Sequence, residues 1–470
     1  MLKPFFLVFL ALSAFAHAPG GFTVVQATNK QVQLTWTGGE PSYVVERKPL
    51  GGVFTPLPVN TNPSSNSYTD STIAPYESYA YRVRVPNSDP SPEIIVGPPP
   101  VGLSLASPVF GSRLRIALDS NGDPAVAYLV YAPQDDPEKS YLEFVSWNRV
   151  TYRWNDPRKV SMIGDILGYS TLARDPATNT WGIAFAKSAS NPRFAISRDN
   201  GVTWSEDRIL NCGDPGCAQV ALAMGGGKVH IATLRNAEGI RYITGGVNDP
   251  PSAWQSQLVP QPIGGAEAMP YLDIAVDSAN QPAVTFWSNT DGYNLILGFW
   301  RPGASTVIAM DTNGFQTDDP EVELKFAGLR PTILAVARRT EEYFSRSDQN
   351  LWITRDQGGA FSRPVNLPSD GNQSLGYPSL AVGSGSQLSV TATVIGGNDE
   401  GVRCGGMKVL EQISESSPWT ICSPIAQEGQ PYYDINHPRA IYAPHDGRYI
   451  VFMNTGVATR YPGVVVWRER

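Results

Sequence analysis

A two-strand phrase recurs seven times along the chain, and it constrains the fold more than any other feature. Each copy has an apolar segment, a short polar turn and a second apolar segment, and successive copies lie about 50–60 residues apart. LRIALDSNGDPAVAYLV and LDIAVDSANQPAVTFW are the clearest copies. The seven copies lie at 114–130, 170–186, 219–234, 272–287, 322–337, 378–393 and 439–454. One or two further β-rich segments follow each copy, so the repeating unit is a sheet of antiparallel strands.

Repeating sheets of this length predict a β-propeller over residues 101–470. A single sheet of this kind cannot bury both of its faces, so the units must pack against one another around a central axis. Seven blades is the favoured count, and six is the alternative because the later copies are degraded. The last unit is short of a strand. A strand near 101–107 is expected to complete it and to remove a free sheet edge.

The composition favours an all-β chain. Tyr, Trp and Phe make up 10% of the residues and charged residues only 17%, which suits packed aromatic layers between strands. The 44 Gly and 40 Pro are spread along the sequence, as expected for many turns rather than for disorder. A formal net charge of −7 argues against nucleic acid as a partner, because phosphate binding needs a basic surface.

The first residues predict a secreted protein. Residues 1–16, MLKPFFLVFLALSAFA, combine one Lys, an apolar run and small residues at the end, which is typical of a cleaved signal peptide. The expected location is therefore outside the cell, at the cell surface or in the periplasm. No later segment approaches the ~18 apolar residues of a membrane span, so none is expected.

Four cysteines in an oxidising compartment are expected to form two disulfides rather than a metal site. Cys212 and Cys217 frame the short loop CGDPGC, and Cys404 would then pair with Cys422. Four cysteines allow three connectivities, and this one is favoured without excluding the others. The four histidines are scattered along the chain, and we expect neither a metal nor another cofactor.

Residues 20–95 are expected to form a separate domain of short strands, which Gly, Pro, Asn and Ser turns separate. With Trp36 in an early strand and Tyr79 in IAPYESYAYRVRV, this segment resembles a fibronectin type III domain. The resemblance implies a β-sandwich in which the hydroxyl of Tyr79 ties a strand to a loop. Residues 96–100, VGPPP, are expected to form a stiff linker, because consecutive prolines hold an extended chain.

Two octets, SRDNGVTW and TRDQGGAF, stand where the third expected strand of a unit turns into the fourth. In each octet an Asp can accept hydrogen bonds from backbone N–H groups and a Gly can supply a positive φ. The aromatic residue can pack into the hydrophobic layer beneath the turn. The octets resemble the Asp-box of the sialidase-like propellers, S/T-x-D-x-G-x-x-W/F. This resemblance implies structural turns on the face away from an active site. The residues concerned are Ser197, Asp199, Gly201 and Trp204, and Thr354, Asp356, Gly358 and Phe361.

A recognisable sialidase active site does not accompany the octets. The family's Arg-Ile-Pro motif does not occur in the sequence. Tyr169 in GYSTLA looks like the family's nucleophilic tyrosine, which could attack an anomeric carbon when paired with a Glu. However, the family places that tyrosine late in the ring, and YPSLA at 377–381 shows that an aromatic residue here belongs to the repeat. Tyr169 is therefore the one catalytic candidate, and the repeat also explains it without catalysis.

Loops before the first strands and after the second strands are expected to meet at one mouth of the ring, where ligands usually bind this fold. Aromatic rings that stack on sugars, with carboxylates and guanidinium groups that bond hydroxyls, favour a glycan site there. The alternative is that exposed loops are simply polar and rich in Tyr. The candidate ligand-binding residues are Tyr169, Tyr271, Trp287, Asp291, Arg338, Arg339, Tyr377, Tyr432, Tyr433 and Asp434.

The sequence as a whole favours a secreted, non-enzymatic recognition protein that binds a carbohydrate or a surface glycoconjugate. One alternative is a sialidase-like glycoside hydrolase, or another glycan-active enzyme whose catalytic groups have diverged. The other alternative is a protein-binding scaffold of the envelope.

Overall fold

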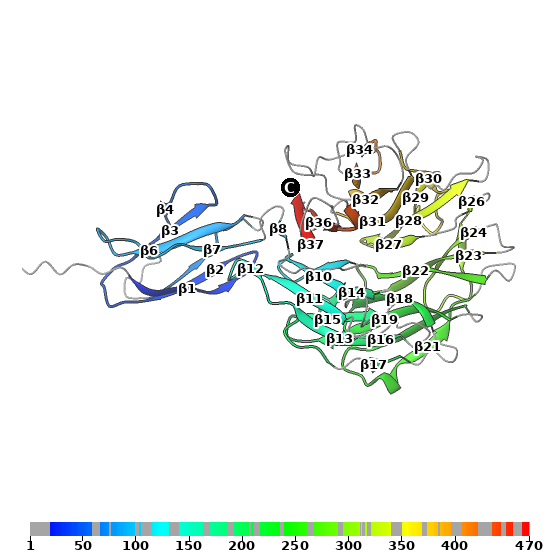
Figure 1. Cartoon of the computed structure of the whole chain (residues 1–470), viewed down its shortest axis with the longest axis horizontal. Helices are drawn as coiled ribbons and strands as arrows, with labels where there is room; N and C mark the ends of the chain where they lie inside the picture. The colour runs from blue at the N-terminus through cyan, green and yellow to red at the C-terminus, as the bar shows by residue number, and fades with distance from the viewer. Residues whose placement is uncertain are drawn as a thin grey trace, which may run out of the picture. The chain divides into compact units, whose positions relative to one another are not determined.

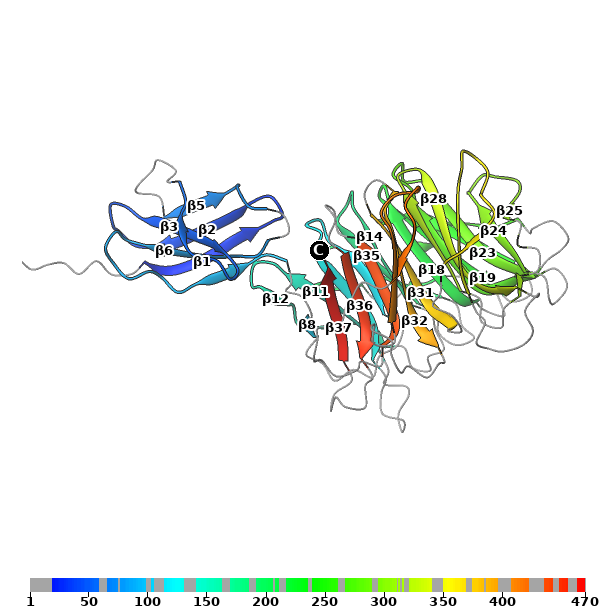
Figure 2. The same cartoon turned by 90° about the horizontal axis from the view of Figure 1, so that it is seen from above.

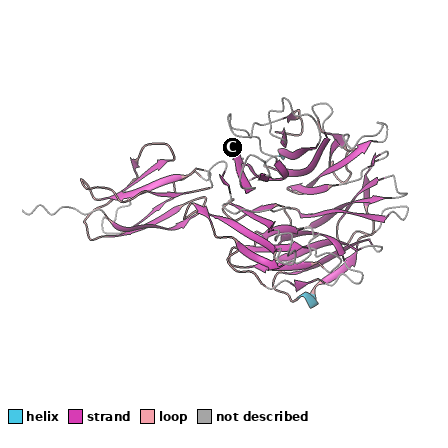
Figure 3. Cartoon of the chain, viewed as in Figure 1, coloured by secondary structure: helices cyan, strands magenta, loops and turns pink. Residues whose placement is uncertain are grey.

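The computed structural model describes residues 19–58, 66–74, 77–98, 103–104, 114–130, 141–162, 170–185, 192–205, 208–210, 217–235, 239–260, 267–289, 295–310, 312, 315–316, 321–339, 350–368, 374–383, 386–395, 407–421, 435–442, 448–454 and 463–469. These residues are almost entirely β-strands and turns, with a short 3-10 helix, η2 (Pro251–Ala253) (Figure 3). The prediction of an all-β chain is therefore confirmed. None of the helical residues described forms a segment that is long and apolar enough to cross a membrane.

The chain divides into two compact units. One comprises residues 1–99 together with 148–153, and the other comprises residues 100–147 together with 154–470. The predicted signal peptide, residues 1–16, lies outside the described residues.

The first unit contains two antiparallel sheets. One has the order β1-β2-β5 and the other the order β4-β3-β6-β7. Their strands are β1 (Gly20–Ala27), β2 (Val32–Thr37), β3 (Val44–Pro49), β4 (Thr55–Pro56), β5 (Ser67–Asp70), β6 (Tyr79–Arg84) and β7 (Ile94–Val96).

Aromatic and β-branched side chains form the core of the first unit. Trp36 and Tyr43 are both buried, and their ring centroids lie 5.4 Å apart in an edge-to-face arrangement. The hydroxyl oxygen of Tyr79 accepts a hydrogen bond from the backbone N–H of Ala74 at 3.0 Å. This contact joins strand β6 to the loop before it, as the tyrosine-corner interpretation of Tyr79 requires.

The second unit contains seven described sheets, which follow one another along the chain (Figure 1). The first sheet consists of β9 (Arg115–Leu118), β10 (Pro124–Val130), β11 (Tyr141–Asn148), β12 (Arg153–Trp154) and β13 (Arg158–Met162). The second consists of β14 (Ser170–Asp175), β15 (Thr180–Phe185), β16 (Arg193–Ser197) and β17 (Arg208–Ile209). The third consists of β18 (Cys217–Gly225), β19 (Lys228–Arg235), β20 (Gly239–Gly246) and β21 (Gln255–Leu258).

The next two sheets consist of β22 (Glu267–Val276), β23 (Pro282–Asn289), β24 (Leu295–Trp300) and β25 (Ile308–Met310), and of β26 (Phe315–Gln316), β27 (Val322–Ala327), β28 (Arg330–Arg339), β29 (Asn350–Arg355) and β30 (Val365–Asn366). The last two consist of β31 (Ser374–Val382), β32 (Leu388–Ile395), β33 (Met407–Gln412) and β34 (Thr420–Ile421), and of β35 (Ile435–Tyr442), β36 (Arg448–Asn454), β37 (Gly463–Glu469) and β8 (Leu103–Ser104).

Seven of these strands, one from each sheet, form a closed ring. Strand β9 lies beside β14, and β18, β22, β27, β31 and β35 continue the cycle until β35 lies beside β9 again. The first strand of the second unit completes the last sheet, because β8 pairs with β37 through Leu103 and Val466. The prediction that a strand near 101–107 completes the last unit is confirmed. Figure 2 shows the strands of neighbouring sheets running side by side.

The hydrophobic core of the second unit lies in layers between neighbouring sheets. One layer joins the first two sheets and contains Phe144, Leu172 and Trp181, and equivalent layers join the sheets that follow. The turns that connect first to second strands are polar for a physical reason. In DSNGD, the carboxylate of Asp119 accepts the backbone N–H groups of Asn121 and Asp123 at 2.7 and 2.9 Å. This Asp therefore closes a hairpin turn.

The first octet forms a turn between β16 and β17. The Asp199 carboxylate accepts hydrogen bonds from the Ser197 hydroxyl at 2.9 Å and from the Thr203 backbone N–H at 2.8 Å. Gly201 has a φ of +86°, and the ring of Trp204 packs against Phe144 with 5.1 Å between centroids. Desolvation would raise the pKa of Asp199, but the hydrogen bonds from Thr203 and Ser197 outweigh it, so the pKa is lowered.

The second octet forms a looser turn between β29 and β30. The Asp356 carboxylate accepts the backbone N–H of Gly359 at 2.7 Å, and Gly358 has a φ of +93°. The Phe361 ring lies 5.0 Å from that of Phe299 on the neighbouring sheet. Phe361, like Trp204 in the first octet, is half-buried rather than enclosed. Both aromatic side chains therefore cover the edge of a layer.

Candidate functional site

A polar cavity of about 430 Å³ lies at the centre of the ring. All seven sheets contribute to it, and each does so through the strand that forms the ring. Because side chains alternate between the two faces of a strand, every second residue of these strands points into the same space. The residues at the equivalent position of the seven strands are Arg115, Thr171, Ala221, Asp273, Glu323, Ser379 and Arg439, and all of them line the cavity.

At the equivalent position of the seven strands, charges of opposite sign occupy different parts of the cavity wall, and Lys325 and Glu321 also line the cavity. The two arginines, Arg439 and Arg115, stand on the neighbouring strands β35 and β9. The two carboxylates, Asp273 and Glu323, stand on the neighbouring strands β22 and β27. Small residues occupy the positions between these pairs. A ligand in the cavity would therefore meet both hydrogen-bond donors and acceptors, and the donor Lys325 lies on the same strand as Glu323.

The Glu323 side chain connects three sheets. One carboxylate oxygen accepts the backbone N–H of Leu380 at 2.5 Å, and the other lies 3.9 Å from a guanidinium nitrogen of Arg439. The same guanidinium group donates to the backbone oxygen of Pro378 at 3.0 Å. These contacts fix the orientation of both charged groups, so the cavity wall is organised before any ligand arrives.

Asp273 is a half-buried carboxyl group in the cavity wall. It accepts the backbone N–H of Leu324 at 2.8 Å. Burial raises the pKa of Asp273, and the nearby Glu323 carboxylate raises it further, whereas Lys325 and the Leu324 N–H oppose the rise. The protonated form of Asp273 is therefore more stable here than that of an ordinary carboxyl group.

Two tyrosines enter the cavity wall next to irregularities in their strands. Tyr271 on β22 and Tyr377 on β31 both line the cavity and are half-buried. The register of β22 shifts between Ala268 and Leu272, and that of β31 shifts between Gly376 and Ser379. Tyr377 has a φ of +50°, a conformation that costs energy for a residue other than glycine. Such bulges re-aim side chains, and here they lie where the strands reach the cavity.

Gln219 brings an amide group to the wall of the cavity. Its side chain is almost fully buried, and its Oε1 atom has no hydrogen-bond partner among the described residues. Its backbone oxygen accepts a hydrogen bond from the Thr233 hydroxyl at 2.6 Å, which holds the strand in place. A buried acceptor without a partner is costly, so Gln219 is a natural contact for a ligand hydroxyl.

Of the ten ligand-binding residues that we predicted, the structure describes the side chains of three, Tyr271, Tyr377 and Trp287. Tyr271 and Tyr377 lie on the cavity wall. Arg338 and Arg339 lie at the end of β28, opposite Gln316 and Phe315 of β26, and their side chains are outside the described part of the structure. The predicted residues that lie outside the described residues altogether are Tyr169, Asp291, Tyr432, Tyr433 and Asp434.

Trp287 does not occupy the position that we predicted for it. Its side chain is 0% exposed and packs between the sheets of β22–β25 and β27–β30. Its indole N–H donates to the backbone oxygen of Glu321 at 3.2 Å. A ring enclosed in this way has no free face on which a sugar could stack, so we remove Trp287 from the candidate ligand contacts.

The disulfide prediction falls mostly on residues that the structure leaves undescribed. Cys212, Cys404 and Cys422 lie outside the described residues, and Cys217 begins β18 without a described side chain. The pairing therefore stays a prediction. Among the described residues, no group of three or more His, Cys, Asp or Glu side chains is placed to hold a metal ion.

Sequence reasoning missed most of the cavity, including Arg115, Gln219, Asp273, Glu323 and Arg439. We searched the loops at the mouth, whereas these residues lie within the ring-forming strands. A signal was present, because LDIAVD and VELKFA place a charged residue at the same point of an otherwise apolar repeat. Buried charges are expensive, so a repeated polar position in an apolar strand indicates a shared cavity.

Replacing Asp273 by Asn is expected to change how stability depends on pH. Because its pKa is raised in the folded protein, Asp273 holds its proton more tightly there than in the unfolded chain. This contribution is complete below the unfolded-state pKa and is lost as the pH rises through the folded-state pKa. Asn stays neutral, so the Tm of D273N should rise relative to that of the wild type from mildly acidic toward neutral pH. Parallel pH profiles of Tm would contradict the raised pKa.

No protein-family model matches the chain, and no curated protein matches it in sequence. Solved structures do resemble it. An ulvan lyase, a polysaccharide lyase, shares 12% identity at a TM-score of 0.49, over 78% of this chain and 93% of its own. An α-L-arabinanase of Penicillium chrysogenum shares 13% identity at a TM-score of 0.46, over 79% of this chain and 98% of its own. A Hadza microbial sialidase shares 11% identity at a TM-score of 0.42, over 96% of this chain and 92% of its own. Likenesses this distant carry no argument about activity.

Proposed function

We propose that this chain is a secreted glycan-recognition protein, in which a seven-bladed β-propeller follows a fibronectin type III-like domain. The closed cycle of ring-forming strands and the pairing of β8 with β37 support the propeller and its count of blades. The two sheets of the first unit and the Tyr79 contact support the fibronectin-like domain. The signal peptide, the two disulfides and the Asp-box role of the octets belong to the same proposal.

The central cavity is the observation that carries the proposed function. Its volume of about 430 Å³ suits one or two sugar rings. Two tyrosine rings can pack against the apolar face of a sugar, while arginines, carboxylates and the Gln219 amide can bond its hydroxyls. The Glu323 carboxylate already has two partners that fix its position, which suits an acceptor in a binding site.

Replacing Tyr377 by Ala is expected to weaken glycan binding by about 1–2 kcal/mol, because the ring contact with the sugar is lost. Tyr377→Phe keeps the ring and should retain most of the affinity. The measurement is a binding titration of the purified protein against sialosides and bacterial or host polysaccharides. If Tyr377→Ala folds normally and binds as tightly as the wild type, the cavity is not the glycan site.

A glycan-active enzyme is the second candidate, and the Asp273 carboxyl group in the cavity wall favours it. A carboxyl group with a raised pKa can act as a general acid, and the neighbouring Glu323 could serve as the second carboxylate of a glycosidase. Asn at position 273 keeps the shape and the hydrogen-bond acceptor but cannot deliver a proton.

Product release separates the two candidates. The wild-type protein is incubated with the same polysaccharides, and new reducing ends are measured apart from binding. A recognition protein should release no sugar in the wild type or in either of the variants Asp273→Asn and Tyr169→Phe, and its affinity should tolerate Tyr169→Phe. Turnover in the wild type that disappears in either variant would establish the enzyme instead. A protein-binding scaffold is the third candidate, and the absence of binding to every glycan would favour it.

A further inference from the structure

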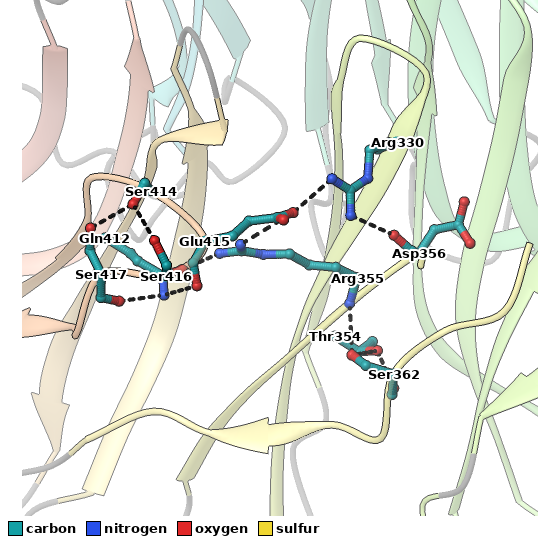
Figure 4. Close-up of polar contacts among 10 residues, drawn as sticks. All are labelled: Arg330, Thr354, Arg355, Asp356, Ser362, Gln412, Ser414, Glu415, Ser416 and Ser417. Atoms are coloured by element: carbon teal, nitrogen blue, oxygen red, sulfur yellow. Dashed lines mark hydrogen bonds and ion pairs between the residues drawn. The ribbon is translucent and has the colours of Figure 1, made fainter. Parts of the chain in front are cut away.

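A second polar cluster lies between the sheets of β27–β30 and β31–β34, at the end where the second octet turns (Figure 4). Arg330 begins β28, Arg355 ends β29, and Glu415 lies in the turn between β33 and β34. The Glu415 carboxylate lies 2.9 Å from a guanidinium nitrogen of Arg330 and 3.8 Å from one of Arg355. One carboxylate therefore lies close to two guanidinium groups, and only its distance to Arg330 is that of a hydrogen bond.

These three side chains belong to the walls of two hollows. One hollow, of about 370 Å³, continues over Gly383 and Leu388, and the other, of about 360 Å³, continues toward Trp419. Arg330, Arg355 and Glu415 line both hollows. The ion pairs thus stand where the two hollows share a wall.

The cation charge in this cluster is incompletely balanced. The Arg355 side chain is only 17% exposed, and its pKa is lowered because burial removes water and the Arg330 guanidinium lies nearby, although Glu415 opposes the effect. Its partner Glu415 is 44% exposed and Arg330 is 49% exposed. Ion pairs with this exposure contribute little to stability, so an incoming oxyanion can replace Glu415 at small cost.

The turn that carries Glu415 is anchored independently of this carboxylate. The buried Gln412 side chain donates to the backbone oxygens of Ser417 and Glu415 at 2.8 and 3.4 Å, and its own oxygen accepts from Arg355. The hydroxyl oxygens of Ser414 and Ser417 lie 2.7 Å apart. The Glu415 side chain can therefore rotate while the backbone of the turn and the position of Arg355 are retained.

We propose that this cluster is a second binding site, which takes the carboxylate or sulfate group of an acidic saccharide in place of the Glu415 carboxylate. Two guanidinium groups can hold such an oxyanion through several charge-assisted hydrogen bonds. The half-buried Trp419 in the adjoining hollow offers a ring for the sugar. The choice of a saccharide rests on the proposed function, whereas the choice of an anion rests on the two arginines alone.

The test compares three linear tetrasaccharides, one of galacturonate, one neutral, and one sulfated version of the neutral chain. Binding to the full-length protein is titrated at low and high salt. The wild type should bind both acidic chains more tightly than the neutral one, and salt should reduce this difference. Comparing the uronate with the sulfated chain shows which oxyanion the site prefers.

Two exposed substitutions test the position of the site. Glu415→Gln removes the internal competitor and should raise the affinity for acidic chains about three- to tenfold, whereas Arg330→Gln should lower it by a similar factor. Affinity for the neutral chain should not change in either variant. Glu93→Gln, which alters an ion pair with Lys48 in the first unit, is the matched control and should have no effect.

Three results would overturn this site. They are equal binding of acidic and neutral chains, an unchanged or lower affinity of Glu415→Gln for acidic chains, and inorganic sulfate competing as strongly as the sulfated tetrasaccharide. If neutral chains still bind and Tyr377→Ala still weakens them, only this inference fails. If no chain binds at all, the proposed function fails with it.

Discussion

Replacing Trp287 by Ala is expected to lower the free energy of unfolding of the second unit by about 3–5 kcal/mol. The side chain is fully buried between two sheets, beside Leu297 and Leu324, and its indole N–H is bonded to the backbone of Glu321. Removing it leaves a cavity that strands cannot easily close, because the sheets on both sides are held by their hydrogen-bond ladders. The measurement is a urea unfolding curve, followed by fluorescence and by circular dichroism.

Two companion variants make the Trp287 result interpretable. Trp287→Phe keeps most of the apolar volume and should lose much less stability. Trp204→Ala removes the same side chain from a half-buried site in the first octet and should fall between the two. The folded fraction of Trp287→Ala should bind glycan normally. A variant that unfolds like the wild type but no longer binds glycan would restore Trp287 to the ligand site.

The ring of sheets could be predicted because the residues that determine each hairpin lie next to one another in the sequence. The apolar strands, the polar turn and the Asp that closes the turn are adjacent in sequence, as in the segment around Asp119. Strand pairing between such neighbours needs no information from distant parts of the chain. The number of repeats and the extra N-terminal strand then indicate how the ring closes, and the pairing of β8 with β37 agrees.

The site was harder to predict, because the direction of a side chain depends on register. Trp287 lies at the end of a second strand, so the sequence suggests a place near the mouth of the ring. Its neighbours on the strand, however, alternate between the two faces, and Trp287 falls on the face that packs against the next sheet. For Tyr377 the bulge in β31 decides the direction. Pro378 marks an irregularity at this point of the strand, but it does not give the direction of the neighbouring side chain. The electrostatic pairing of Glu323 with Arg439 joins residues from different sheets, which only the closed ring brings together.

Replacing Gly201 by Ala is expected to destabilise the protein much more than the same change at Gly358. Both glycines are the fifth residue of their octets and have a positive φ, +86° for Gly201 and +93° for Gly358. A side chain in this conformation costs about 1–2 kcal/mol at either position. At Gly201 a Cβ atom would also lie 2.0 Å from the ring of Phe144, whereas at Gly358 it would meet nothing within 4 Å.

The Phe144 ring cannot easily move away from a new methyl group at position 201. It is 1% exposed, and its centroid lies 5.3 Å from that of Trp181 and 5.1 Å from that of Trp204. We therefore expect overpacking to add about 1–3 kcal/mol to the conformational cost at Gly201. Because the conformational cost is shared, the difference between the two variants in urea unfolding measures the overpacking alone. If both variants lose the same free energy of unfolding, the Phe144 ring moves aside for the new methyl group. The first octet would then pack against the core less tightly than its contacts indicate.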